Sequence, residues 1–181
     1  MTMVPIRSVV ISQPSSNVII NSIPQTYAHL HLRIYERSFN AAAFDAMYIY
    51  GIDGTGNGIN CAFHQYFGTN NAVGTNGQTA QFYYQPGFIP ARNTLGGVYA
   101  AGIVDILDYS STTKKKTFRS IWGYNDNGST SGTPFLGYTS GYSEGLGTSA
   151  MTSISFAVNS GFEPGTRFDL YGITTSGLSG A

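Results

Sequence analysis

The sequence predicts an all-β protein: a jelly-roll-like antiparallel β-sandwich of about eight to ten strands with little or no helix. Three observations predict this fold. Apolar and polar residues alternate over many short runs, which is the pattern of half-buried strands. Clusters of Gly, Asn, Pro and Ser separate these runs. The chain also holds 23 Gly, 13 Tyr and 11 Phe among its 181 residues, a composition suited to strands joined by tight turns.

The clearest predicted strand covers residues 27–36. Its apolar face takes every second residue (Ala28, Leu30, Leu32 and Ile34), and polar or aromatic residues stand between them. This alternation predicts a strand with one face toward a core and the other toward solvent. The other predicted strands, in chain order, cover residues 4–11, 17–23, 46–52, 61–67, 79–84, 98–107, 117–124, 152–158 and 166–173.

The segments between these runs are expected to be turns and loops, and the main ones cover residues 53–58, 68–77, 87–97, 123–132 and 161–165. The best candidate for a helix lies at residues 38–46. Phe39, Ala42, Ala43 and Ala46 recur there at a spacing close to that of a helix. We expect one or two helical turns between strands at this place.

The chain length predicts one domain, because about 150 residues per domain is typical. Residues 1–25 contain prolines but no acidic residue, and they precede the first confident strand. They are interpreted as an N-terminal arm or a first strand, ahead of a single β-sandwich domain at residues 26–181. As an arm, they would lie largely outside the sandwich and add a strand to a neighbouring chain.

Residues 123–150 form a second unusual segment. The segment is rich in Gly, Ser and Thr and is too long for a hairpin loop. Its aromatic residues suggest a contact surface, with a surface loop as the alternative: Tyr124, Phe135, Tyr138 and Tyr142.

The charge balance excludes several classes of function. Nine basic and nine acidic residues give a net charge of zero, which argues against binding nucleic acid through its phosphates. One cysteine, Cys61, excludes an internal disulfide and a multi-cysteine zinc site. No apolar run approaches the roughly 20 residues that span a bilayer. Residues 1–7 do not resemble a targeting segment, so synthesis in a cytoplasm is expected. Charged residues make up only 10% of the chain, a composition that favours a protein that is part of a larger assembly over a freely soluble one.

Residues 141–145 match the G-x-S-x-G motif that places a nucleophilic serine in many hydrolases. The motif needs a buried strand before Ser143, a helix after it, and an acid and then a histidine downstream. Gly and Thr flank the segment, and the last histidine, His64, lies upstream. The sequence therefore predicts a loop here and no catalytic residue, so the chain is not expected to be an enzyme.

Other candidate sites are also weak. Residues 54–58, with Asp53 and Asn57, are a Gly-rich hairpin turn rather than a dinucleotide or cation site. His29 and His31 share a strand face, as metal ligands do, and a third ligand would have to come from His64 or a carboxylate. Histidines on a polar face are more often solvated or interfacial. Residues 114–116 are three lysines at a hairpin tip, interpreted as solvated. The glycosylation motif at residues 127–129 has meaning only in a secretory pathway. No metal and no cofactor are predicted.

Four segments taken in order resemble a known family. They are residues 23–33 (IPQTYAHLHLR), 49–57 (IYGIDGTGN), 106–117 (ILDYSSTTKKKT) and 154–173, which ends in GFEPGTRFDLYGI. This order resembles a family of virion structural proteins of tailed bacteriophages, which end in an F-x-x-G-[ST]-x-F-x-L-Y-G-I strand. The chain departs from the family after Asn57, where members often continue with Asn-Tyr and this chain has Gly-Ile-Asn-Cys.

The resemblance implies a capsid decoration (cement) protein that strengthens the shell of a virion assembled in the host cytoplasm. It implies binding to the major capsid protein or other virion proteins, as a homo-oligomer with a trimer expected before a dimer. One alternative is a tail or fibre component with a receptor-binding role. Another is a carbohydrate-binding jelly-roll module for a host surface glycan, with four rings that would stack on sugars: Trp122, Tyr124, Tyr138 and Tyr142.

The closing strand supports a physical interpretation of its own. Alternation predicts that Phe168 and Leu170 face the core, opposite Ile154 or Phe156, while Arg167, Asp169 and Tyr171 face away. Gly165 is expected to take a positive φ in the turn before the strand, and Gly172 to leave space for a close backbone approach.

Overall fold

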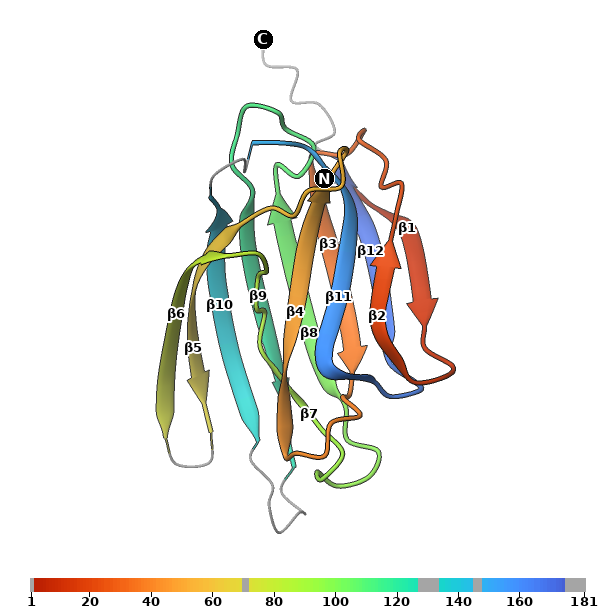
Figure 1. The fold of residues 1–181 in the computed structure, drawn as a ribbon, viewed down its shortest axis with the longest axis vertical. Helices are drawn as coiled ribbons and strands as arrows, with labels where there is room; N and C mark the ends of the chain where they lie inside the picture. The colour runs from red at the N-terminus through yellow and green to blue at the C-terminus, as the bar shows by residue number, and fades with distance from the viewer. Residues whose placement is uncertain (1, 70–71, 127–133, 145–147, 175–181) are drawn as a thin grey trace.

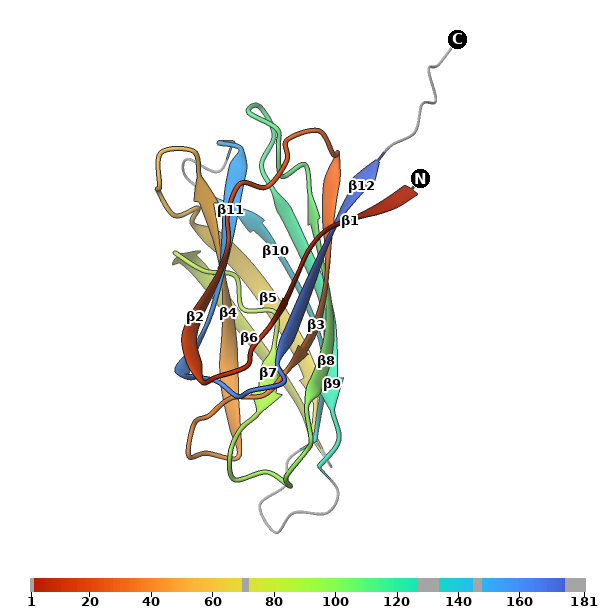
Figure 2. The ribbon, with the colours of Figure 1, turned by 90° about the vertical axis from the view of Figure 1, so that its right-hand side faces the viewer.

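The structure is a computed structural model that describes residues 2–69, 72–126, 134–144 and 148–174. Over these ranges the chain forms twelve β-strands and no helix (Figure 1). The strands make two antiparallel sheets that face one another as the layers of a sandwich (Figure 2). The predicted all-β fold class is confirmed.

The larger sheet has eight strands in the order β1-β12-β3-β8-β9-β10-β5-β6. Their bounds, in that order, are Thr2–Val10, Arg167–Thr174, His29–Glu36, Ala100–Leu107, Thr117–Tyr124, Phe135–Ser143, Cys61–Gly68 and Val73–Gln81. The smaller sheet has four strands in the order β2-β11-β4-β7, with bounds Ser15–Ile20, Met151–Phe162, Phe44–Asp53 and Phe88–Pro90.

The strand pairing is that of a jelly roll with two insertions. The pairs β1·β12, β2·β11, β3·β8 and β4·β7 are all antiparallel and nest inside one another along the chain. They alternate between the two sheets, as in a double Greek key. The inserted strands β5 and β6 follow β4, and β9 and β10 follow β8. The two insertions meet where β10 pairs with β5, which widens one sheet to eight strands.

Aromatic side chains fill the space between the sheets. Phe168 of β12 stacks on Phe156 of β11, with ring centroids 4.4 Å apart. Leu170 is also fully buried, whereas Arg167 is exposed. The predicted faces of the closing strand are therefore confirmed, and Phe156 lies across the sandwich from Phe168. Gly165 has a φ of 94°, as the turn before β12 was expected to require.

Of the two interpretations of the N-terminal segment, the structure shows strands: residues 2–25 lie within the sandwich and do not form an arm outside it. β1 pairs with β12 at the edge of one sheet, and β2 pairs with β11 at the edge of the other. Four side chains of this segment are buried in the core: Ile11, Val18, Ile20 and Ile23. Prolines are tolerated because an edge strand leaves alternate N–H groups without a partner, and Pro has no N–H to lose.

Residues 38–46 are bends followed by the start of β4, so the expected helical turns are absent. β7 and β10 lie inside segments predicted to be loops, and β6 covers Val73–Gln81 instead of residues 79–84. These strands are rich in Gly, Thr and Ser or very short, so they carry little apolar alternation. Pairing with neighbouring strands, which the local sequence does not encode, makes them extended.

Candidate functional site

Four large side chains stand in a row across the outer face of the eight-stranded sheet. Ile103 of β8 pairs with Ile121 of β9, which pairs with Tyr138 of β10, which pairs with Tyr66 of β5. Residues directly opposite one another on neighbouring strands have their side chains in contact range. Their exposed fractions are 45%, 59%, 39% and 58% in that order, so a continuous apolar row faces solvent.

Leu136 and Val73 extend this row toward one end of the strands. Leu136 pairs with Gly68, which pairs with Val73, and the two side chains are 68% and 84% exposed. We call the six residues together the apolar patch: Tyr66, Val73, Ile103, Ile121, Leu136 and Tyr138. They expose on the order of 700 Å², above the few hundred Å² that a soluble monomer usually leaves in one apolar patch.

Two shallow grooves run over the apolar patch. One, of about 570 Å³, lies over β8, β9 and β10, and the other, of about 420 Å³, lies over β9, β10 and the β5–β6 hairpin. Both are lined by Ile121 and Leu136. The patch is therefore a wide, open surface with shallow depressions.

A polar strip borders the patch one row further along the strands. Asp105 accepts hydrogen bonds from Arg119 Nη2 and His31 Nδ1, each at 2.7 Å. These three residues pair directly across β3, β8 and β9. Burial raises the pKa of Asp105, but the hydrogen bonds and charges of Arg119 and His31 outweigh it, so the pKa lies below its ordinary value. A polar rim beside an apolar centre is the usual anatomy of a protein interface.

The four rings proposed for stacking on sugars do not form one platform. Trp122 and Tyr124 are buried on the inner face of β9, where Trp122 packs against Phe88 with centroids 5.8 Å apart. Tyr138 and Tyr142 lie on the outer face of β10 and are exposed. The expectation of one sugar-stacking platform is wrong, because side chains of a strand alternate between the two faces of the sheet. The two rings of β9 point to the inner face and the two rings of β10 point to the outer face.

Ser143 is the last residue of β10 and is fully buried. Its hydroxyl accepts a hydrogen bond of 2.8 Å from the backbone N–H of Lys116. The strand is antiparallel in a sheet, which differs from the strand–turn–helix of a nucleophile elbow. The hydroxyl thus helps to join β10 to the segment before β9. The glycosylation motif at residues 127–129 lies outside the described residues.

The two strand histidines have separate partners. His31 pairs with Asp105, while His29 Nδ1 accepts a hydrogen bond of 3.0 Å from the backbone N–H of Asp108. Over the described ranges, no three His, Cys, Asp or Glu side chains come together as a metal site would need.

The turn at residues 53–58 is organised by one carboxylate. Asp53 Oδ1 accepts hydrogen bonds from Thr55 N, Thr55 Oγ1 and Asn57 N at 2.8–2.9 Å. The hydrogen bond from the Thr55 hydroxyl is the main reason that the pKa of Asp53 is lowered. Gly56 takes a φ of 87° within this turn. The geometry is that of an Asx-type hairpin turn, in agreement with the structural interpretation of this motif.

Lys116 corrects the expectation of a solvated lysine tip. Its side chain is buried, and Nζ donates to the carbonyl oxygens of Lys114 and Thr148, at 3.1 Å and 3.0 Å, and of Ser111. Burial lowers the pKa of Lys116. Lys114 is 67% exposed and lies 3.6 Å from Asp108, as a solvated pair would. Of the three lysines, the last therefore acts as a structural cation that holds loop carbonyls.

Arg37 was not singled out in the sequence. Its guanidinium is buried and donates to carbonyl oxygens at 2.8–3.4 Å, and it lies 3.6 Å from Glu163. The carbonyls belong to Arg92, Thr94, Leu95 and Val98. Arg37 thereby fixes the loop between β7 and β8. In the sequence, Arg37 stands directly after a predicted strand, where an arginine is usually exposed. No local pattern therefore indicates that this arginine is buried.

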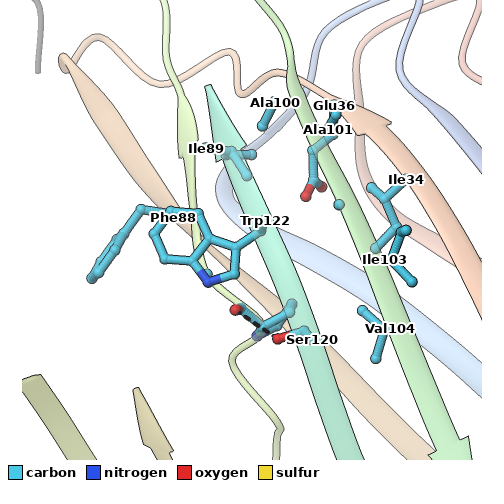
Figure 3. A pocket seen from close by; sticks show the side chains of 13 residues that line it. Ile34, Glu36, Phe88, Ile89, Ala100, Ala101, Ile103, Val104, Ser120 and Trp122 are labelled. Atoms are coloured by element: carbon cyan, nitrogen blue, oxygen red, sulfur yellow. Dashed lines mark hydrogen bonds between the residues drawn. The ribbon is translucent and has the colours of Figure 1, made fainter. Parts of the chain in front are cut away.

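A small cavity lies between the sheets, and Glu36 points into it (Figure 3). Its volume of about 10 Å³ is at most that of one water molecule, so it is too small for an organic ligand. Among the residues that the structure describes, Glu36 Oε2 and Trp122 Nε1, both in its lining, find no hydrogen-bond partner. Burial and the nearby Asp45 raise the pKa of Glu36 well above its ordinary value.

Comparison with known protein families, curated proteins and solved structures finds no significant match to this chain. In the part of the chain that the structure describes, no helix has the length and apolar character to cross a membrane. The outer face of the eight-stranded sheet is therefore the candidate functional site on its own geometry.

Proposed function

We propose that this chain is a structural protein of a bacteriophage virion, a capsid decoration (cement) protein that docks on the shell through the apolar patch. The role is non-catalytic, and the location is the assembled particle. The observation that carries the proposal is the apolar patch itself. Ile121 is 59% exposed and Leu136 is 68% exposed. Apolar side chains left this exposed give no stability to the fold and promote aggregation, so their exposure indicates a surface that a partner covers.

The size of the patch supports a protein partner. A stable interface buries roughly 800 Å² on each partner, and the six patch residues expose most of that area. Tyr66 and Tyr138 are of a residue type enriched at the centres of interfaces. The Asp105–Arg119 pair at the border provides a polar rim that orients the partner.

Rigidity of the docking face also supports the proposal. Five of the six patch residues stand on β5, β8, β9 and β10, whose inner faces pack against the core, and Val73 stands on β6, which pairs with β5. Side chains held on a paired sheet lose little conformational entropy when they are buried by a partner. The jelly roll is a fold used by viral capsid domains and by lectins, so the fold by itself selects neither. The resemblance of residues 23–173 to virion proteins favours the first.

The test uses particles of the phage that encodes this chain. Ile121→Lys places a charge in the middle of the patch, and Ile19→Lys makes the same change on β2, where the residue is 46% exposed. We expect Ile121→Lys to fold but to be lost from purified particles, whereas Ile19→Lys is retained like the wild type. Quantitative mass spectrometry of the particles measures both. Retention of Ile121→Lys at wild-type level would contradict docking through the patch.

Copy number separates the shell from the tail. A decoration protein is present in hundreds of copies per particle, and a tail or fibre component in a few tens or fewer. A low copy number would therefore favour the tail alternative. Binding of the isolated protein on a glycan array would favour the carbohydrate-binding alternative, for which Tyr138 and Tyr142 remain exposed.

A further inference from the structure

Each sheet of the sandwich ends in two edge strands: β1 and β6 in the larger sheet, and β2 and β7 in the smaller. An edge strand presents unpaired N–H and C=O groups along one side, which invites pairing with another chain. Natural proteins block such pairing with prolines, bulges, charges or very short strands. Whether each edge carries one of these devices indicates where a further strand can be added.

Three of the four edges are blocked. β7 has only three residues and ends in Pro90. β1 contains Pro5 and the charged Arg7, and its register shifts between them. β2 keeps regular pairing with β11 only over residues 17–20 before the register shifts. Each of these strands therefore resists the addition of a partner strand by one of the known devices.

β6 carries none of these devices over most of its length. Its nine residues, Val73–Gln81, include no proline and no charged side chain. It stays in unbroken register with β5 from Val73 to Gln78, and the register shifts only beyond that point. No described strand lies on its other side, and it forms the left-hand edge in Figure 1. β6 is thus an open pairing edge.

We infer that two copies of this chain associate by antiparallel pairing of their β6 strands. A strand that pairs antiparallel with its own copy has a two-fold axis at the centre of the contact, which closes the assembly as a dimer. Because β6 is uncharged, two identical edges meet without like-charge repulsion. A strand of an unrelated partner need not be free of opposing charges in this way. A second copy of β6 is therefore the partner strand that fits this edge best.

The dimer has a consequence for the apolar patch. The two-fold axis is perpendicular to the paired sheets, so the outer faces of both copies point the same way. Two eight-stranded sheets become one sheet of sixteen strands. Val73 on β6 and Tyr66 on the adjacent β5 bring each patch up to the contact, and the two patches form one surface. The dimer itself does not depend on the proposed virion role.

Sedimentation equilibrium of the isolated full chain tests the inference. The wild type is expected to have about twice the monomer mass of 19.4 kDa. The double change Thr75→Lys with Thr79→Lys puts charges on an exposed part of β6, and we expect it to weaken the dimer at least about tenfold. Val10→Lys, at a 60% exposed position on the opposite edge of the same sheet, is the control and stays dimeric.

Hydrogen exchange separates loss of the dimer from loss of the fold, because it measures the protection of the β6 amides directly. Backbone amides of residues 73–78 are expected to lose protection in the double variant, while the thermal transition stays close to that of the wild type. A monomeric or trimeric wild type would overturn the inference. So would a double variant that is still dimeric, or a loss of the dimer in Val10→Lys. A dimer that fails to bind particles would refute the virion role and leave the β6 contact intact.

Discussion

Gly172 shows how one missing side chain lets an aromatic ring pack. A Cβ at this position would lie 2.3 Å from ring atoms of Tyr27. The sequence predicted a close approach at this glycine, and the neighbour that approaches is a ring rather than backbone. We expect Gly172→Ala to lower the free energy of unfolding by about 1–3 kcal/mol, the usual cost of overpacking. Urea denaturation measures the change.

Gly58→Ala serves as the matched control for that measurement. In the part of the chain that the structure describes, no heavy atom lies within 4 Å of a Cβ built on Gly58. Its unfolding free energy should stay within about 0.5 kcal/mol of the wild type. An equal loss in both variants would show that the effect comes from the backbone and not from the Tyr27 ring.

Glu36 gives a prediction about pH. Burial raises the pKa of its carboxyl in the folded protein above the value in the unfolded chain. The folded state therefore holds the proton more tightly, and the stability from this group is lost as pH rises from the ordinary glutamate range toward the raised pKa. Glu36→Gln keeps a neutral side chain at all pH values. The difference in unfolding free energy between variant and wild type should grow with pH over that window.

Denaturant titrations at several pH values test this prediction. Carboxyls that do not interact with Glu36 contribute equally in both proteins, so subtraction removes their contribution and leaves that of Glu36 and its coupling to Asp45. A difference that does not change with pH would contradict the raised pKa.

At the scale of elements, β12 depends on one face. Leu170 is buried, so Leu170→Ala should cost about 2–5 kcal/mol of unfolding free energy. Asp169 lies on the other face and forms an ion pair of 2.8 Å with Arg167, which is 53% exposed. A surface pair whose arginine is half exposed and whose carboxyl is 16% exposed contributes about 1 kcal/mol or less, so Asp169→Ala should cost less than Leu170→Ala. Denaturant unfolding of both variants decides the order, and the reverse order would contradict the face assignment.

The first two strands are elements of the sandwich and not an appendage. Deletion of residues 2–20 removes an edge strand from each sheet and takes Val18 and Ile20 out of the core. It also strips β12 and β11 of a neighbour. We expect the truncated chain to be unfolded, as measured by circular dichroism and by the loss of a cooperative thermal transition. A truncated chain that still folds cooperatively would restore the interpretation of residues 1–25 as an arm.

At the scale of the whole molecule, the sandwich separates stability from association. The core lies between the sheets, whereas the apolar patch faces away from it. The double change Ile121→Lys with Leu136→Lys should therefore leave the unfolding free energy within about 1 kcal/mol of the wild type. The same change should raise the solubility, because it divides the patch with charge. Ammonium sulfate precipitation and thermal unfolding measure the two effects separately, and a large loss of stability would show that the patch supports the fold.

The sequence by itself determined the all-β class, the faces of β3 and β12, and the turns at Asp53 and Gly165. These features depend on residues close together in the chain. Alternation with a period of two determines which face of a strand is buried, and local hydrogen bonds determine the turns. The tertiary structure alone decided that β1 and β2 are edge strands of the two sheets and not an arm, that β10 is a strand, and that Lys116 is buried. It also brought together the apolar patch. The patch residues are spread along the chain from Tyr66 to Tyr138. They become neighbours because β10 pairs with β5. Such contacts between distant segments depend on the packing of the whole chain, and no local pattern encodes them.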